Sequence, residues 1–124
     1  MRYCFNRKEA KDHGEGGVFV GATPQDGDEI IIIEDVITAG TALRETLPYI
    51  KNAAEAAVAG MIISVDRMER TASGKTAVAD VYDEFGFRIY PIVNVSEIRE
   101  YIAAKLDAAS LAAMDGYMEQ YCVL

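Results

Sequence analysis

Runs of apolar residues alternate with charged or glycine-rich segments along the chain, as in a protein built from strands and helices in turn. Three runs predict core strands: Glu29–Ile33, Ala57–Val65 and Phe87–Val93. The first contains four consecutive isoleucines, which are β-branched and show no polar alternation. We therefore expect it to be a parallel strand that is covered on both faces.

Four segments between and after these strands predict helices. In the first helix Leu43, Leu47 and Ile50 fall on one face. Pro48 lies inside it and should kink or shorten it, because proline lacks the backbone N–H that a helix needs. Alternating strands and helices predict an α/β fold with a parallel sheet. The predicted helices are Ala42–Asn52, Thr76–Phe85, Ser96–Lys105 and Asp107 to about Gln120.

Several helix ends carry residues with capping chemistry. Gly86 can end the second helix, because glycine readily adopts a positive φ. We expect Ser96 to cap the third helix without a capping box, since Arg99 stands three residues later, while Glu97 suits the positive helix end. Asp107 is expected to cap the last helix.

The N-terminal part predicts short strands joined by a loop. Met1–Phe5 reads as the end of a strand and Val18–Val20 as a return strand, while Asn6–Gly17 is polar and glycine-rich, which is typical of a mobile loop. Thr23–Asp28, T-P-Q-D-G-D, predicts a turn. Because three parallel strands make a thin sheet, we expect a single domain over residues 1–124 that is incomplete at its N-terminus. Further sheet would come from a partner or from a longer protein.

The charge is acidic overall and unevenly distributed. The chain has 20 acidic and 12 basic residues, a net charge of −8, yet residues 1–17 sum to +1 and residues 18–124 to −9. An acidic body disfavours nucleic acid and anionic lipid as partners. The basic N-terminal segment favours one small anionic ligand, and the alternative is a solvated charged loop.

Two further features bear on location. The longest uncharged stretch, Ala56–Val65, has ten residues, whereas a membrane-spanning helix needs roughly 20. No secretory leader is visible at the start of the sequence. Cys4 and Cys122 are too few for a disulfide framework, so we expect reduced thiols and a cytoplasmic protein without a membrane partner.

The segment Ile30–Leu43, I-I-I-I-E-D-V-I-T-A-G-T-A-L, carries the most specific chemistry. Ligands of open α/β sheets bind beyond the carboxyl ends of the strands, where this segment has two acids, a loop and a helix start. Backbone N–H groups of residues 38–41 and two threonine hydroxyls suit a phosphate. Glu34 and Asp35 suit sugar hydroxyls, directly or through a divalent cation. A ribose-phosphate site is therefore predicted, and the alternative is a strand, an acidic turn and a threonine-capped helix.

These residues resemble a known family. Ile33–Ala42 is similar to the 5-phosphoribosyl-1-diphosphate (PRPP) motif of type I phosphoribosyltransferases. Phe5–Gly16, F-N-R-K-E-A-K-D-H-G-E-G, resembles the flexible catalytic loop of the orotate phosphoribosyltransferases. The downstream segments S-V-D-R-M-E-R and A-V-A-D-V-Y-D-E-F-G-F resemble the same branch. The resemblance implies the parallel-sheet, Rossmann-like phosphoribosyltransferase fold without the family's N-terminal portion.

The resemblance also implies a reaction. Orotate and PRPP would give orotidine 5′-monophosphate and diphosphate in pyrimidine biosynthesis, with Mg²⁺ held through PRPP near Glu34 and Asp35 rather than by direct protein ligands. The catalytic loop 6–17 would reach the neighbouring site of a homodimer, with Lys11 mattering most to the rate. Thr38 and Arg67 would contact orotate. The implied PRPP contacts are Arg7, Lys8, Lys11 and His13, of which all four would also be catalytic, and the loop residues Glu34, Asp35, Val36, Ile37, Thr38, Ala39, Gly40, Thr41 and Ala42.

Three alternatives remain beside this hypothesis. The chain could be a phosphoribosyltransferase for another base, which a comparison of orotate with purines would reveal. It could be a non-catalytic PRPP-binding regulator that binds nucleic acid, although the −9 charge of residues 18–124 disfavours this. It could also be an inactive fragment, in which case the isolated chain would be unfolded or aggregated.

Overall fold

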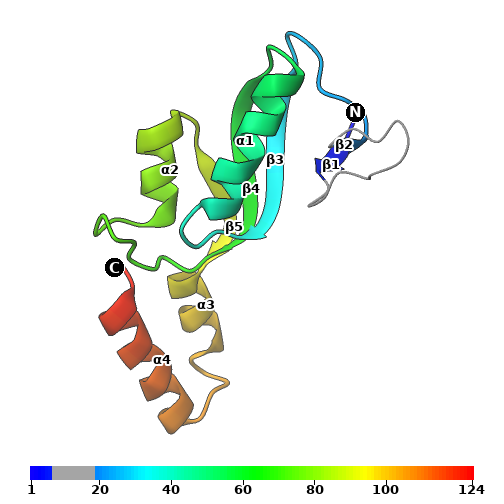
Figure 1. Cartoon of the computed structure of the whole chain (residues 1–124). Helices are drawn as coiled ribbons and strands as arrows, with labels where there is room; N and C mark the ends of the chain where they lie inside the picture. The colour runs from blue at the N-terminus through cyan, green and yellow to red at the C-terminus, as the bar shows by residue number, and fades with distance from the viewer. Residues whose placement is uncertain (7–18) are drawn as a thin grey trace, which may run out of the picture. The chain divides into compact units, whose positions relative to one another are not determined.

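The computed structural model describes residues 1–6 and 19–124 (Figure 1). These residues form two compact units, one of residues 1–30 and 41–57 and the other of residues 31–40 and 58–124. The greater part of the predicted catalytic loop, residues 7–17, lies outside the described residues, as does Val18. Asn6, which was expected to open that loop, is instead the last residue of a strand.

In the first unit, two short strands form an antiparallel pair. β1 (Cys4–Asn6) pairs with β2 (Phe19–Gly21), which confirms the expected strand and return strand with small changes of bounds. Gly21 has a φ of +103°, and a Cβ there would lie 2.6 Å from the carbonyl oxygen of Tyr3. Glycine is therefore required at the end of this pair.

The predicted turn at residues 23–28 is present and is tied to the segment after the first helix. The backbone N–H of Gly27 donates to the carbonyl of Glu55 at 2.9 Å, and the N–H of Glu55 donates to the Asp26 carboxylate at 2.8 Å. Asp28 accepts from the N–H of Gln25 and pairs with Arg2. Aspartate and glycine thus provide the turn chemistry that the sequence indicates.

Helix α1 (Thr41–Ala53) confirms the first predicted helix, with Leu43, Leu47 and Ile50 buried at 3–4% exposure. The expectation that Pro48 shortens it is wrong, because the helix continues unbroken for five residues beyond the proline. Pro48 lies on the exposed side, where its ring displaces no core residue. The buried face therefore outweighs the lost backbone hydrogen bond.

The second unit contains a three-stranded sheet in the order β3–β4–β5, which confirms the α/β class (Figure 1). The strands are β3 (Glu29–Val36), β4 (Ala57–Asp66) and β5 (Ile89–Asn94). Residues 29, 30 and 57, at the beginnings of β3 and β4, are counted with the first unit. β4 and β5 are parallel, with Ile62 opposite Tyr90 and Asp66 opposite Asn94. β3 and β4 are neighbours joined through a helix, the connection typical of parallel strands.

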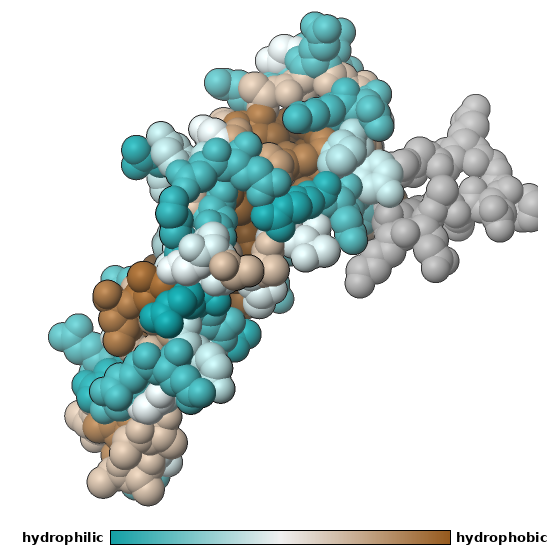
Figure 2. All heavy atoms as spheres, turned by 60° about the vertical axis from the view of Figure 1, so that its left-hand side comes forward, coloured by the Kyte–Doolittle hydropathy of each residue, from teal (hydrophilic) through white to brown (hydrophobic). Residues whose placement is uncertain are grey.

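The expectation that the isoleucine strand is covered on both faces is wrong. Ile31 and Ile33 are 58% and 75% exposed, whereas Ile30 and Ile32 are half-buried. β3 is an edge strand of this sheet, and only one of its two alternating faces is covered by the described residues. On β5, Tyr90 and Ile92 are likewise exposed. Apolar surface is visible between polar residues in Figure 2.

Three further helices belong to the second unit: α2 (Ala77–Phe85), α3 (Val95–Ile102) and α4 (Ala108–Tyr121). Gly86 caps α2 and Asp107 caps α4, as predicted, whereas Thr76, expected as the first residue of α2, is its N-cap. The expectation that Ser96 caps α3 without a capping box is wrong. Asn94 is the N-cap, and it forms a complete box with Glu97, which stands three residues later.

The core of the second unit is small and apolar. Met61 and Ile63 of β4 and Val81 of α2 are its most buried large side chains, at 2%, 0% and 1% exposure. β5 begins at Ile89 rather than at Phe87, which instead stacks on Phe85. No helix in the described part of the chain has the length and apolar character needed to cross a membrane.

Candidate ribose-phosphate and arginine sites

The two acids of the predicted sugar site lie inside a strand rather than after it. Glu34 and Asp35 are both exposed residues of β3, which continues to Val36. Successive side chains of a strand leave it on opposite faces, so the two carboxylates do not form a side-by-side pair. The Asp35 carboxylate accepts a hydrogen bond from the backbone N–H of Val36 at 2.7 Å. Each carboxylate is therefore a separate acceptor near the end of β3.

The loop that follows β3 links the strand to helix α1. Ile37 is buried at 7% exposure and anchors the loop, while Thr38 and Ala39 are exposed. Gly40 is buried and has a φ of +72°, a left-handed conformation that favours glycine. Thr41 is the first residue of α1, and Ala42 follows it. The predicted order of strand, glycine-containing loop and helix start is confirmed.

The second predicted site residue follows the neighbouring strand. Arg67 comes directly after Asp66, the last residue of β4, and is exposed. Parallel strands bring their carboxyl ends to one edge of a sheet, so residues 37–40 and Arg67 leave the sheet at the same edge. This edge is the usual binding side of an α/β sheet.

Arg67 is held by two side chains that sequence reasoning missed. Its Nη2 donates to the hydroxyl of Tyr117 at 3.0 Å and forms an ion pair with Glu69. The hydroxyl of Tyr117 in turn donates to the Glu69 carboxylate. Tyr117 lies 50 residues along the chain, on α4, so no local sequence pattern connects it with Arg67. Asp66, the partner that its position suggests, instead accepts from the N–H of Met68.

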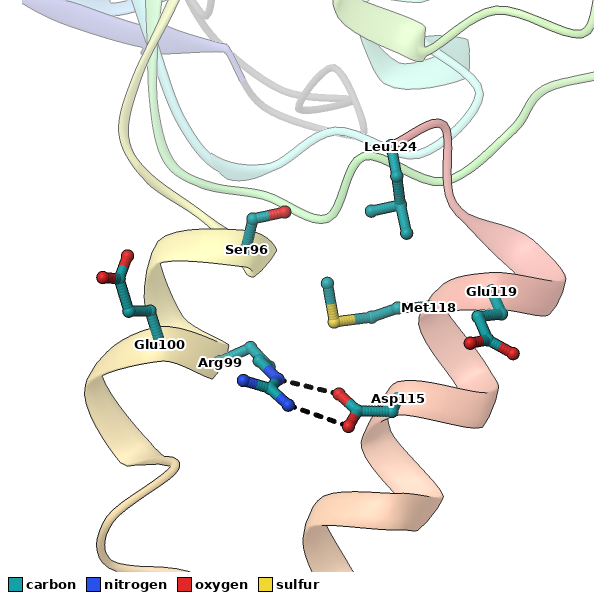
Figure 3. A pocket seen from close by; sticks show the side chains of 7 residues that line it. All are labelled: Ser96, Arg99, Glu100, Asp115, Met118, Glu119 and Leu124. Carbon is teal, nitrogen blue, oxygen red and sulfur yellow. Dashed lines mark hydrogen bonds and ion pairs between the residues drawn. The ribbon is translucent and has the colours of Figure 1, made fainter.

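A separate hollow lies between α3 and α4 (Figure 3). Arg99 and Asp115 join the two helices across it through paired hydrogen bonds of 2.7 and 2.8 Å. These bonds hold the pKa of the Asp115 carboxyl below its usual range and raise the pKa of Arg99. Because acidic side chains outnumber basic ones, the hollow disfavours a phosphate. Its lining consists of Ser96, Arg99, Glu100, Asp115, Met118, Glu119 and Leu124.

The described residues offer no dedicated metal cage. Among residues 1–6 and 19–124, no three histidine, cysteine, aspartate or glutamate side chains gather closely enough to hold an ion. The exposed carboxylates of Glu34 and Asp35 are oxygen ligands of the kind Mg²⁺ accepts. Since Mg²⁺ often binds through one or two carboxylates together with substrate phosphates, these residues fit a cation that arrives with a diphosphate.

Four predicted site residues, Arg7, Lys8, Lys11 and His13, lie outside the described part of the chain. Their roles therefore remain predictions from the sequence.

Comparison with known proteins identifies clear relatives. The chain is 48% identical over 105 residues to orotate phosphoribosyltransferase of Clostridium beijerinckii, a match that covers 85% of this chain and 47% of the relative. It is 40% identical over 130 aligned positions to the protein of the same name from Lachnoclostridium phytofermentans, covering 99% of this chain and 58% of the relative. No protein-family model matches the chain.

A solved structure supports the same relationship. The orotate phosphoribosyltransferase structure from Francisella tularensis superposes with a TM-score of 0.76 at 31% identity, covering 99% of this chain and 57% of that one. A phosphoribosyltransferase structure from Corynebacterium diphtheriae, at 24% identity and a TM-score of 0.57, shares the fold. The chain spans about half the length of the curated relatives it matches.

Proposed function

We propose, from the premise that this chain belongs to the orotate phosphoribosyltransferase family, that it transfers ribose 5-phosphate from PRPP to orotate and releases diphosphate. The observation that carries the proposal is the shared sheet edge. Residues 37–40 of the motif follow β3 at the edge where Arg67 follows β4. In this proposal one edge would supply a loop for the phosphate of PRPP and a cationic side chain for an anionic base.

The 5-phosphate would lie against the loop before α1. Exposed Thr38 supplies a hydroxyl, and the positive φ of Gly40 lets the backbone turn toward a ligand without a clash. Glu34 and Asp35 would accept from ribose hydroxyls individually, because they leave β3 on opposite faces.

Charge separation is the difficulty of this reaction. As diphosphate departs from the anomeric carbon, the ribose ring becomes cationic, so a catalyst must neutralise the leaving group and exclude water. Mg²⁺ bound to PRPP would supply part of that neutralisation. In this mechanism the remaining neutralisation of the leaving diphosphate comes from the basic loop residues Arg7, Lys8, Lys11 and His13, which would close over the diphosphate after binding.

Orotate differs from purine bases by its carboxylate. A guanidinium recognises a carboxylate through charge-assisted hydrogen bonds, and Arg67 is an exposed guanidinium at the binding edge. We therefore propose that Arg67 binds the orotate carboxylate and that Thr38 makes a further contact with orotate. We also propose a cytoplasmic homodimer in which loop 6–17 of one subunit serves the neighbouring site, with no role for nucleic acid.

The direct test is the release of diphosphate from PRPP and Mg²⁺ with orotate, uracil, hypoxanthine or adenine as acceptor. Release that depends on orotate alone is expected. Lys11→Ala should lower the rate of diphosphate release at least about 100-fold, since neutralisation of the leaving group is lost. Lys51→Ala, at an exposed position of α1, should leave the rate unchanged.

A second comparison addresses base recognition. Arg67→Ala should abolish orotate-dependent release, and Arg88→Ala, another exposed arginine, should not. Release with a purine but not with orotate would assign the chain to another base. Equal release by the wild-type chain and Lys11→Ala would remove Lys11 from the mechanism.

A further inference from the structure

We propose that the C-terminal segment Tyr117–Val123 positions Arg67 for its ligand, with Tyr117 and Glu69 as the positioning residues. The inference rests on the function proposed above for Arg67. It adds that recognition of the orotate carboxylate depends on a helix far along the sequence, α4, which itself touches neither PRPP nor the phosphate loop in that proposal.

The first argument is the closed network around the guanidinium. Arg67 donates to Tyr117, Tyr117 donates to Glu69, and Glu69 forms an ion pair with Arg67. Each of the three side chains therefore has a polar contact with the other two. Both polar contacts of the Arg67 side chain, with Tyr117 and with Glu69, are made by Nη2. Within residues 1–6 and 19–124, Nε and Nη1 donate no hydrogen bond and remain able to donate to an anion. A long side chain that is 46% exposed is thereby restrained before any ligand arrives.

The second argument is a backbone strap between the C-terminus and the loop that carries Arg67. The N–H of Arg70 donates to the carbonyl of Tyr121 at 2.7 Å, and the N–H of Val123 donates to the carbonyl of Met68 at 2.8 Å. An antiparallel bridge pairs Glu69 with Cys122 between these two bonds. The loop therefore gains the hydrogen bonds of a short strand pair from the end of the chain.

Side chains reinforce the strap from both sides. The guanidinium of Arg70 donates to the carbonyl of Cys122 at 3.1 Å, and the Cys122 thiol lies 3.4 Å from the carbonyl oxygen of Arg67. Cys122 is only 2% exposed. The C-terminal segment that contacts residues 67–70 is thus partly buried in the core, and it is fixed by packing as well as by hydrogen bonds.

The third argument is the backbone of Met68, the residue after Arg67. Its φ is +55°, the only positive φ of a non-glycine residue in the described part of the chain. Such a conformation costs free energy and persists where surrounding contacts over-determine it. Here the N–H of Met68 donates to Asp66 and its carbonyl accepts from Val123. The turn that aims Arg67 therefore depends on the C-terminal strap.

The test compares three variants of the chain. Tyr117→Phe removes the hydroxyl that contacts Arg67, and Glu69→Gln keeps an acceptor but removes its charge. Tyr121→Phe is the matched control, because its ring lies beside that of Tyr117 but its hydroxyl makes no hydrogen bond within the described residues. The measurements are the Nη–H nuclear magnetic resonance signal of Arg67, the dissociation constants of orotate and of PRPP with Mg²⁺, and the unfolding midpoint.

Positioning predicts a selective loss. Tyr117→Phe should weaken orotate binding about 5- to 20-fold and change the Arg67 signal, with PRPP affinity within about 2-fold of wild type. Tyr121→Phe should match wild type in all measurements. If orotate binds the wild-type chain and Tyr117→Phe equally well, the positioning role is overturned while the proposed function stands.

The remaining outcome separates the two claims. If orotate does not bind the wild-type chain, the proposed function fails, and the Arg67 signal without ligand then decides the positioning role. A slowly exchanging Nη–H signal of Arg67 in wild type that is lost in Tyr117→Phe supports it, and an unchanged signal overturns it. Equal losses of orotate and PRPP affinity together with a lower unfolding midpoint would mean that Tyr117 only stabilises the fold, which also overturns the proposal.

Discussion

A pair of isoleucines provides a sharp test of how the sheet is covered. Ile63 on β4 is fully buried, at 0% exposure, whereas Ile33 on β3 is 75% exposed. Both are β-branched strand residues, so substituting each by alanine removes the same three carbon groups and a similar strand preference. The difference between Ile63→Ala and Ile33→Ala therefore reports burial.

The expected magnitudes follow from those exposures. Ile63→Ala should lower the free energy of unfolding by about 2–5 kcal/mol, since it loses the transfer energy of its methyl groups and leaves a cavity. For Ile33, three-quarters exposed, only about a quarter of a ~2.4 kcal/mol transfer term is at stake, ~0.6 kcal/mol. A strand-preference loss of up to about 1 kcal/mol applies to both variants.

Urea unfolding followed by circular dichroism measures the difference. With a slope of about 1–3 kcal/mol per molar urea, Ile63→Ala should move the midpoint by at least about 0.5 M more than Ile33→Ala. Ile63→Val, expected to cost about 0.5–1.5 kcal/mol, serves if the alanine variant does not fold. Sizing at several concentrations is the control for self-association. Equal losses at both positions in a monomeric sample would refute the exposed face of β3.

Three other predictions follow from single side chains. Because Arg99 lowers the pKa of Asp115, the pair stabilises the fold at neutral pH and this contribution disappears as the pH falls through that lowered pKa. The stability difference between wild type and Asp115→Asn should therefore shrink below pH about 4 in urea titrations, and a constant difference would contradict it. Asn94→Ala should cost about 1 kcal/mol and Ser96→Ala less than about 0.5 kcal/mol, and the reverse order would restore Ser96 as the cap. Exposed Cys4 should react promptly with a thiol reagent, while Cys122, buried and with its pKa raised by that burial, should react only on unfolding; two prompt thiols would disprove the burial of Cys122.

Local patterns predicted most of the elements correctly, because the signals lie within a few residues of one another. The capping of α2 by Gly86, the capping of α4 by Asp107 and the apolar face of α1 are examples. The alternation of strands with helices was sufficient to predict the parallel sheet. The error over α3 was local too, because Asn94 and Glu97 form the N-x-x-E signature two residues before Ser96 and Arg99.

Features that depend on distant neighbours could not be predicted in this way. Four isoleucines in a row indicate a buried strand, yet burial depends on what covers each face, and Ile31 and Ile33 stay mostly exposed among the described residues. The network of Arg67 with Tyr117 joins residues 50 positions apart. Motif resemblance identified Arg67 but gave no information on what holds it.

The most direct test of the central claim is calorimetric titration of PRPP with Mg²⁺ into the wild-type chain, Thr38→Val and Thr23→Val. Both threonines are exposed, but only Thr38 lies in the loop after β3. The ribose-phosphate loop predicts binding by the wild-type chain and by Thr23→Val with equal affinity, and affinity about tenfold lower for Thr38→Val, which loses a hydroxyl donor to a charged phosphate. The same PRPP affinity in all three proteins, or no binding by the wild-type chain, would contradict it.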